Sequence, residues 1–156
     1  MIELDIPGGE TLRISHLVLD YNGTLARDGE LLEGVAEKMK DLAIHLQLHV
    51  ITADTHGTVA KKLAGLPCSL EIIGLTEQDK QKEAYVRYLG ANNAAAIGNG
   101  RNDGLMLKEA ALGFVLVQEE GACIAAILQA DIMCTNILHV FDILLNPARL
   151  KATLRN

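Results

Sequence analysis

The sequence predicts an α/β fold in which a central parallel sheet is covered by helices on both faces, and three observations support this prediction. Short apolar runs alternate along the chain with segments whose apolar residues recur three or four positions apart. With 156 residues, 49% of them hydrophobic, the chain can bury a core of its own. No repeat, low-complexity tract or linker interrupts the pattern. We therefore treat residues 1–156 as a single domain.

The first fifteen residues have a different pattern. Residues 2–6 and 11–14 each alternate in polarity, and they flank the turn sequence Pro7-Gly8-Gly9-Glu10. Such a pattern is typical of a β-hairpin. Residues 1–15 are therefore expected to form an N-terminal hairpin that precedes the parallel sheet.

From His16 onward, the expected strands and helices follow one another in alternation. The strands are short apolar runs: 16–20, 48–52, 70–75, 94–97, 114–117 and 132–134. The helices have apolar residues at helical spacing: 32–46, 58–66, 76–89, 102–111, 122–130 and 137–145. At the start of the third helix, Thr76 and Asp79 form a capping pattern. Alternation of this kind produces a parallel sheet between two helical layers.

The charge pattern excludes two classes of partner. Fourteen Lys and Arg against twenty Asp and Glu give a net charge of −6, and no basic run is present, so we expect no nucleic-acid partner. The most apolar region, residues 121–145, is interrupted by Asp131 and Asp142, which argues against a membrane span. The N-terminus lacks the basic and apolar regions of a signal peptide. We therefore expect a cytoplasmic protein without a membrane partner.

Cysteines and histidines show no metal-binding spacing. The three cysteines are far apart in the chain, so neither a disulfide framework nor a zinc site is expected. Among the histidines, His45 and His49 are four positions apart, but they straddle a predicted helix–strand junction and would not share a helix face. The full set of histidines is His16, His45, His49, His56 and His139.

Polar residues gather where the predicted strands end. Asp20 ends one strand, Thr52 ends another and Asn99 follows a third, while Lys80 and Lys82 lie near the start of the helix before that third strand. The carboxyl ends of parallel strands meet at one edge of the sheet, where ligands bind in open α/β folds. A carboxylate can attack phosphorus or bind a cation, and hydroxyl and ammonium groups can neutralise phosphoryl oxygens. These residue types together indicate a phosphate-handling site.

The motifs at these strand ends resemble those of the haloacid dehalogenase-like (HAD) phosphohydrolases. They are an apolar strand leading into Asp20-Tyr-Asn22-Gly23-Thr24, then Val50-Ile-Thr52, a lysine, and Gly98-Asn99-Gly100-Arg101-Asn102-Asp103. Within that superfamily the chain most resembles the phosphorylation domain of P-type ATPases, through Thr52-Ala-Asp54 and Thr58-Val-Ala60. The resemblance covers roughly residues 16–145 and implies a Rossmann-like, HAD-like three-layer sandwich.

Two spacings distinguish this chain from the pumps and from capped phosphatases. Thr24 and Thr52 are 28 positions apart, where a pump carries a whole nucleotide-binding domain. The segment between Thr52 and Lys82 is too short for a cap domain. We therefore expect neither a pump nor a dedicated ATP site. The site is expected to be open to bulky substrates or closed by another subunit, which would make the protein a homo-oligomer.

The resemblance implies a role for each catalytic motif residue. Asp20 would be the nucleophile that forms an aspartyl-phosphate, and it would also bind Mg²⁺. Asn22 stands where many family phosphatases have an Asp that acts as general acid and base, and its backbone carbonyl would bind Mg²⁺. Thr52 would bind the transferring phosphoryl group. Lys82 is expected to be the family lysine, with Lys80 as the alternative.

The resemblance also implies which residues complete the phosphate and metal sites. The phosphate-binding residues would be Gly23, Thr24, Ala53 and Asn102. The metal ligands would be Asp20, Asn22, Asn99 and Asp103. Asn99 replaces an Asp that ligates Mg²⁺ in the family, so this site loses one negative charge, although an amide oxygen can still bind a hard cation.

The chain is thus expected to be a Mg²⁺-dependent phosphohydrolase that acts on a small phosphorylated substrate. Because the Asn22 amide cannot carry a proton, turnover is expected to be slow and to favour activated leaving groups such as acyl or aryl phosphates. The alternative is a regulatory or binding module that keeps the HAD-like fold without turnover, because Asn22 and Asn99 both replace family aspartates.

Overall fold

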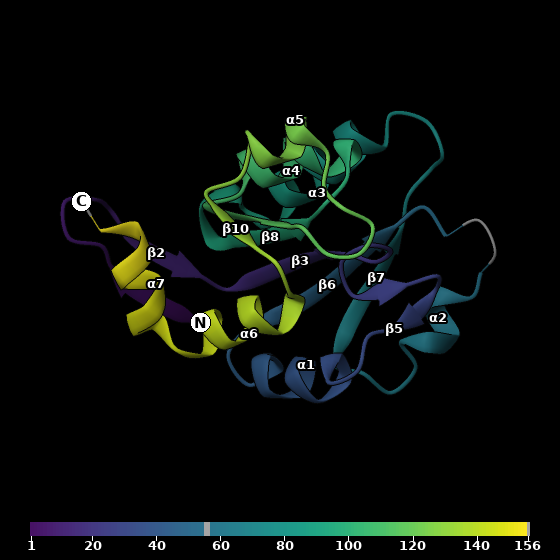
Figure 1. The fold of residues 1–156 in the computed structure, drawn as a ribbon, viewed down its shortest axis with the longest axis horizontal. Helices are drawn as coiled ribbons and strands as arrows, with labels where there is room; N and C mark the ends of the chain where they lie inside the picture. The colour runs from purple at the N-terminus through teal and green to yellow at the C-terminus, as the bar shows by residue number, and fades with distance from the viewer. Residues whose placement is uncertain (55–56, 156) are drawn as a thin grey trace.

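The computed structural model describes residues 1–54 and 57–155, and its centre is a parallel sheet of six strands, as the sequence predicts (Figure 1). In sheet order the strands are β10 (Ile132–Cys134), β9 (Leu112–Leu116), β8 (Ala94–Gly98), β3 (His16–Asp20), β6 (Gln47–Thr52) and β7 (Cys68–Ile72). The chain adds β6 and β7 on one side of β3 and then crosses back to add β8, β9 and β10 on the other. The strand order therefore reverses between β3 and β8.

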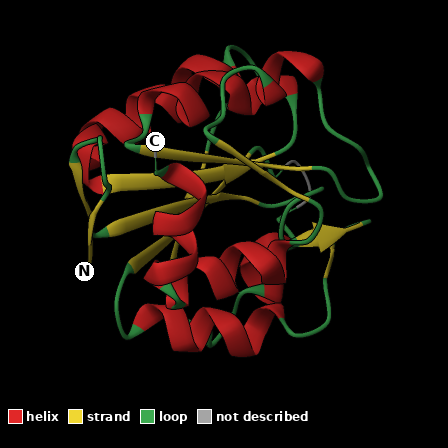
Figure 2. Cartoon of the chain, turned by 60° about the vertical axis from the view of Figure 1, so that its left-hand side comes forward, coloured by secondary structure: helices red, strands yellow, loops and turns green. Residues whose placement is uncertain are grey.

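Helices cover both faces of this sheet, so the predicted three-layer arrangement is confirmed (Figure 2). On one face α1 (Val35–Ala43) packs against α6 (Ile137–Leu145). On the other face α4 (Gly104–Glu109) packs between α3 (Gln78–Leu89) and α5 (Ile124–Ile127). None of the helices in the described ranges is long and apolar enough to cross a membrane.

The central strand β3 shows why the predicted strands are apolar on both faces. Leu17 and Leu19 lie in the core beneath α1 and α6, whereas Val18 lies in the opposite core with Ile51. All four side chains are fully buried. Since side chains alternate along a strand, the two ends of β3 share the face of Val18 and look toward α3.

The N-terminal hairpin is also confirmed. Its strands β1 (Ile2–Asp5) and β2 (Thr11–Ile14) pair antiparallel. Leu4 and Ile14 are buried in the core that α1 and α6 cover, and α7 (Pro147–Leu154) packs against β1. Because β2 leads directly into β3, the hairpin lies at the amino end of the sheet, and the N-terminus and the last described helix, α7, lie beside it (Figure 1).

Several helices differ from the sequence-based boundaries. The helix predicted over 58–66 is reduced to α2 (Val59–Lys62), because Gly65 adopts a left-handed φ of 80° and Pro67 follows. The capping pattern at Thr76 is not used, since Glu77 has a φ of 50° and α3 begins after it. The helix α7 was outside the predicted set.

Between β3 and β6 the chain forms α1 and one small hairpin. This hairpin pairs β4 (Ala26–Arg27) with β5 (Glu30–Leu31) through Asp28 and Gly29, whose φ angles are 51° and 81°. The buried Tyr21 donates its hydroxyl to the Gly29 carbonyl at 2.9 Å. The hairpin, which we call the flap, is thereby fastened to the end of β3.

Candidate active site at the carboxyl edge of the sheet

A buried group of three charged side chains, which we call the charged triad, lies at the carboxyl edge of the sheet. Asp20 ends β3, Lys82 lies in α3, and Asp103 ends a short 3₁₀ turn that follows β8. The Lys82 Nζ donates to Asp20 Oδ1 at 2.7 Å and to Asp103 Oδ1 at 2.6 Å. The exposed fractions of Asp20, Lys82 and Asp103 are 8%, 1% and 0%.

The topology explains why these three residues meet. Asp20 and Asp103 follow β3 and β8, the two strands between which the strand order reverses. Open α/β sheets bind ligands in the crevice at such a switch point. Lys82 reaches the same place from α3, where it shares the buried helix face with Val86 four residues later.

The Asp103 carboxylate holds the loop after β8 in shape. Its Oδ2 accepts the backbone N–H groups of Asn99 at 2.9 Å and Gly100 at 2.8 Å. A Cβ on Gly98 would lie 2.4 Å from the Asp103 Cγ, so that position has no room for a side chain. Because Lys82 occupies Oδ1, both carboxylate oxygens of Asp103 are engaged within the protein.

The electrostatics of the charged triad are unbalanced in favour of negative charge. Burial and the neighbouring Asp103 carboxylate raise the pKa of Asp20 to about 7, although Lys82 opposes this rise. Burial would lower the pKa of Lys82, but the charges of Asp20 and Asp103 outweigh it and the pKa is raised. Lys82 therefore remains an ammonium, and a cation placed beside Asp20 would keep that carboxyl ionised.

A cavity of 410 Å³ opens above Asp20 and gathers most of the residues that the sequence predicted for the site. The predicted residues in its wall are Asp20, Asn22, Thr52, Ala53, Lys82, Asn99 and Asn102. Thr24 and Asp103 are fully buried behind this wall, and Gly23 lines a neighbouring cavity. The wall also includes Gln78, whose Oε1 accepts a hydrogen bond from Asn102 Nδ2 at 2.8 Å.

The loop after Asp20 is a tight turn around one carbonyl group. The Tyr21 carbonyl accepts the N–H groups of Thr24, Leu25 and Ala26 at distances of 3.2, 2.9 and 3.0 Å. The turn leaves Thr24 Oγ1 3.4 Å from Asp20 Oδ2, in a buried position. Thr24 therefore contacts Asp20 from below, on the side away from the cavity.

The two candidate lysines lie in very different surroundings. Lys82 is buried in the charged triad. Lys80 has a side chain that is 65% exposed, and it pairs with Glu77 on the surface. The geometry therefore favours Lys82 as the lysine that serves Asp20.

Besides Gln78, two residues near Asp20 that the sequence did not predict, Gln118 and Glu120, lie in the loop after β9. The Gln118 Nε2 donates to the carbonyls of Gly23 and Thr24, each at 3.1 Å, and joins this loop to the Asp20 turn. Glu120 lines the cavity beside Asn99. The rule that polar residues after parallel strands meet at one edge would have identified both, since they follow a predicted strand.

The cavity wall presents oxygen donors of the kind that Mg²⁺ prefers. Asp20, Asn22 and Asn99 line this wall, and the Asp20 carboxylate, the Asn22 backbone carbonyl and the Asn99 amide oxygen would be the donors. The Asn99 Nδ2 donates to the Gly121 carbonyl at 3.0 Å, which leaves Oδ1 as the free end of the amide. No group of three or more His, Cys, Asp or Glu suited to a metal occurs in the described part of the chain. A cation here would thus need amide and carbonyl oxygens, and the donors present fit a hard divalent ion.

A second cavity, of 540 Å³, adjoins the first and shares Glu120 with it. Its walls come from the flap, from the loop after β9 and from the start of α6. They combine apolar Leu32 and Leu138 with the guanidinium-bearing Arg27. The two cavities together form a polar pocket at the carboxyl edge of β3 with a partly apolar extension beneath the flap.

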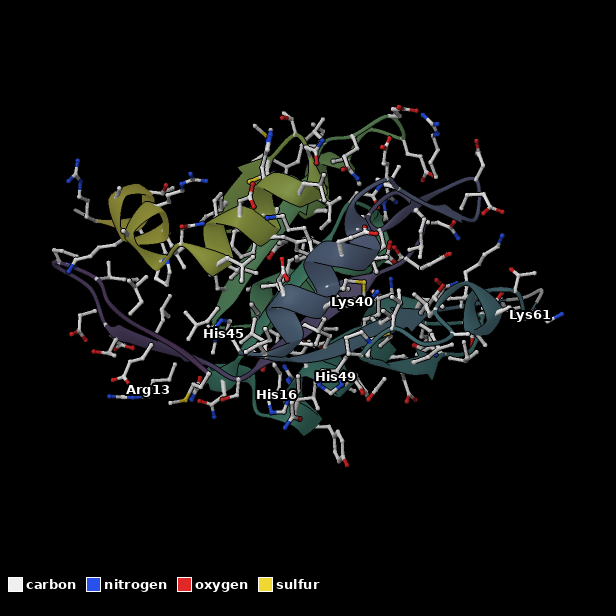
Figure 3. The ribbon with its side chains drawn as sticks, turned by 90° about the horizontal axis from the view of Figure 1, so that it is seen from below. Arg13, His16, Lys40, His45, His49 and Lys61 are labelled. Atoms are coloured by element: carbon white, nitrogen blue, oxygen red, sulfur yellow. The ribbon has the colours of Figure 1, made fainter. Side chains whose placement is uncertain are left out.

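A separate polar cluster, which the sequence did not predict, lies at the opposite end of β3. His16 Nδ1 and His49 Nε2 share a hydrogen bond of 3.1 Å, and His49 Nδ1 shares one of 3.0 Å with the Tyr85 hydroxyl. Figure 3 shows His16 and His49 beside each other, with His45 apart from them. His56 lies outside the described residues.

Comparison with known proteins gives matches of two kinds. No family model matches the chain. Two uncharacterized proteins of Methanocaldococcus jannaschii are similar in part. One is 51% identical over 61 residues, which are 39% of this chain and 66% of that protein. The other is 41% identical over 39 residues, which are 25% of this chain and 89% of that protein.

Solved structures match most of the chain. The 3-deoxy-D-manno-octulosonate 8-phosphate phosphatase of Moraxella catarrhalis superposes with a TM-score of 0.71 over 85% of this chain and 86% of its own, at 18% identity. A Legionella pneumophila protein described as a HAD superfamily (subfamily III A) hydrolase superposes with a TM-score of 0.71. The match covers 90% of this chain and 86% of the Legionella chain, at 20% identity. The chain has the HAD-like fold. At these identities the comparison establishes the arrangement of the HAD-like fold and no more.

A pump shares part of its structure with this HAD-like chain. A zinc-transporting PIB-type ATPase in its E2·Pi state superposes with a TM-score of 0.61, at 23% identity. The match covers 78% of this chain but only 20% of the ATPase. The predicted likeness to part of a P-type ATPase is therefore confirmed at the level of the fold.

Proposed function

We propose that the protein is a Mg²⁺-dependent phosphohydrolase that works through a phosphorylated Asp20. The observation that carries this proposal is the Asp20 carboxylate at the floor of a polar cavity, held by the buried ammonium of Lys82. The HAD-like fold supports it, since the similar Moraxella phosphatase structure contains a magnesium ion, a phosphate ion and a sugar acid.

The residues present can perform both halves of such a reaction. An Asp20 oxygen attacks phosphorus and forms an acyl phosphate while the bond between phosphorus and the leaving-group oxygen breaks. Water then attacks the same phosphorus, releasing inorganic phosphate and restoring the carboxylate. Lys82, Thr52 and Asn102 would bind the phosphoryl oxygens as negative charge redistributes.

Asp20, the Asn22 carbonyl and Asn99 would hold the Mg²⁺ ion, which would neutralise charge on the transferring group. This assignment follows from the donors in the cavity wall. Asp103 would act indirectly, because both of its oxygens are already engaged by Lys82 and by the backbone of Asn99 and Gly100.

The substrate class follows from Asn22 and from the shape of the cavities. General acid catalysis contributes about 10²–10⁴-fold to many reactions, and the Asn22 amide cannot supply it. Good substrates would therefore be small acyl or aryl phosphates, whose leaving groups need no proton. Their organic part would fit the adjoining cavity beneath the flap, which contains apolar side chains.

Phosphate release from acetyl phosphate and from an aryl phosphate tests the proposal. We expect turnover that requires Mg²⁺, disappears in Asp20→Asn and persists in Asp41→Asn, a matched control on the exposed surface of α1. Mass spectrometry after acid quenching should locate the phosphoryl group on Asp20. Equal turnover in the wild type and Asp20→Asn would contradict the proposal.

The second candidate function is a binding module without turnover. The amides at Asn22 and Asn99 favour it, because both replace groups that the chemistry uses in related enzymes. Saturable Mg²⁺ binding by a wild-type protein that releases no phosphate and forms no phosphorylated Asp20 would establish this alternative.

A further inference from the structure

We propose that Glu120 supplies the second carboxylate of the metal site and replaces the charge that is missing at Asn99. This inference rests on the proposed function, since it concerns the cation that Asp20 would share. It assigns a metal-binding role to a residue of the loop after β9, a part of the chain outside the four sequence motifs.

The loop that carries Glu120 is held by hydrogen bonds on both sides of this residue. Gln118 donates to the carbonyls of Gly23 and Thr24, and its own Oε1 accepts the N–H of Ile137 at 2.8 Å. On the other side of Glu120, the Gly121 carbonyl accepts the Asn99 amide at 3.0 Å. Glu120 thus lies between one anchor on the Asp20 turn and another on the Asn99 side chain.

The side-chain oxygens Glu120 Oε2 and Asn99 Oδ1 lie close to each other. A Cβ placed on Gly23 would lie 2.7 Å from Glu120 Oε2 and 2.7 Å from Asn99 Oδ1. Because both oxygens lie at that distance from one point, they are at most 5.4 Å apart. Two oxygens of one Mg²⁺ ion, each about 2.1 Å from the metal, lie up to about 4.2 Å apart. A small side-chain movement would bring both to the same ion.

Few carboxylates face the cavity above Asp20. Only Asp20 and Glu120 do so among the described residues. Asp20 shares its charge with Lys82, and Asp103 is buried with both oxygens engaged. No described residue donates a hydrogen bond to the Glu120 carboxylate, so it is available for a cation.

The neighbouring Glu119 provides an internal contrast. Its carboxylate pairs with Arg27 on the flap, and it lines the adjoining cavity instead of the one above Asp20. Glu119 and Glu120 are both exposed, so each can be changed to Gln without disturbing the core. Glu119→Gln is therefore a matched control for Glu120→Gln.

Mg²⁺ titration by calorimetry, without any phosphorylated substrate, tests the inference independently of turnover. We expect Glu120→Gln to weaken Mg²⁺ binding by about tenfold or more, and Glu119→Gln to bind as the wild type does. Adding Asn99→Asp to Glu120→Gln should restore the affinity, because it returns one carboxylate to the same place.

The outcomes separate this inference from the proposed function. Equal Mg²⁺ affinity in the wild type and Glu120→Gln, together with Mg²⁺-dependent phosphate release by the wild type, would overturn the role of Glu120 alone. A wild type that binds no Mg²⁺ and releases no phosphate would overturn both. Weakened binding in Glu120→Gln that Asn99→Asp does not restore would assign the loss to loop structure and would also contradict the inference.

Discussion

The two ends of β3 carry two polar clusters that share β3 and α3 but differ in burial and in charge. At the carboxyl end, Asp20 meets Lys82 of α3 within the charged triad. At the amino end, His16 meets His49 of β6, which in turn meets Tyr85 of α3. Lys82 and Tyr85 are three residues apart in α3, so one helix serves both clusters.

The two clusters differ in whether their charges and hydrogen-bonding groups are balanced within the protein. The histidine cluster consists of groups that can all be neutral, and their hydrogen bonds are mutual. The charged triad has two carboxylates for one ammonium and opens to a cavity. A buried excess of charge is costly unless a ligand compensates it, whereas a neutral hydrogen-bonded cluster needs none. The comparison therefore supports the proposed function at the carboxyl end and favours a structural role for the histidine cluster.

Loss of the buried ammonium should have the largest effect. Lys82→Met would leave Asp20 and Asp103 buried without their shared partner, and breaking a buried ion pair in this way typically costs about 3–5 kcal/mol. We expect urea denaturation to show a loss of this size and phosphate release to disappear. Lys80→Met, which alters an exposed pair with Glu77, should leave the stability close to that of the wild type. Similar losses in both variants would contradict the assignment of Lys82.

The metal-free protein should become less stable as pH rises from about 4 to about 7. The folded protein retains a proton on Asp20 up to a pKa of about 7, whereas the unfolded chain releases it near the ordinary aspartate pKa of 3.8. Raising the pH in this window therefore favours unfolding, by at most about 4 kcal/mol at about 1.4 kcal/mol per pH unit. Thermal unfolding in EDTA should show this slope in the wild type and a much flatter one in Asp20→Asn.

Mg²⁺ should reverse part of this destabilisation. Binding to the folded state alone would add about 1.4 kcal/mol at a Mg²⁺ concentration ten times the Kd. The melting temperature at pH 8 should therefore rise with Mg²⁺ in the wild type. A comparable rise in Asp20→Asn would place the ion elsewhere on the protein.

The histidine cluster should give the smallest effect, with the opposite slope. Burial and the charge of His16 lower the pKa of His49, so the unfolded chain takes up a proton at a higher pH than the folded protein does. Stability should therefore fall as pH decreases below the ordinary histidine pKa of about 6.5. His49→Gln should flatten this acid limb, whereas His45→Gln, on the exposed end of the α1 segment, should leave it unchanged.

The sheet and its helical layers could be predicted because apolar runs and helical spacing are local signals. The runs at residues 16–20 and 94–97 correspond closely to β3 and β8. The length of α2 could not be predicted from the hydrophobic pattern alone, because the backbone conformation of the residues that follow shortens this helix. Gly65, with its left-handed φ, is one example.

The sequence motifs identified only part of the site. The motif pattern placed Asp20, Thr52 and Asn99 at one edge, and the structure brings them into one cavity wall. Gln118 and Glu120 belong to no motif, and their position depends on how the loop after β9 folds back onto the Asp20 turn. The contact between His16 and His49 depends on the register of two parallel strands, which the sequence does not specify.

The position of the two chain termini has a practical consequence. The N-terminus and the last described helix, α7, lie beside the N-terminal hairpin at the amino end of the sheet (Figure 1). The cavity opens at the carboxyl end. An affinity tag, a fluorescent fusion or a linker to a solid support could be attached at either terminus and would point away from the cavity mouth. Surface-immobilised protein should therefore admit ligands as freely as protein in solution.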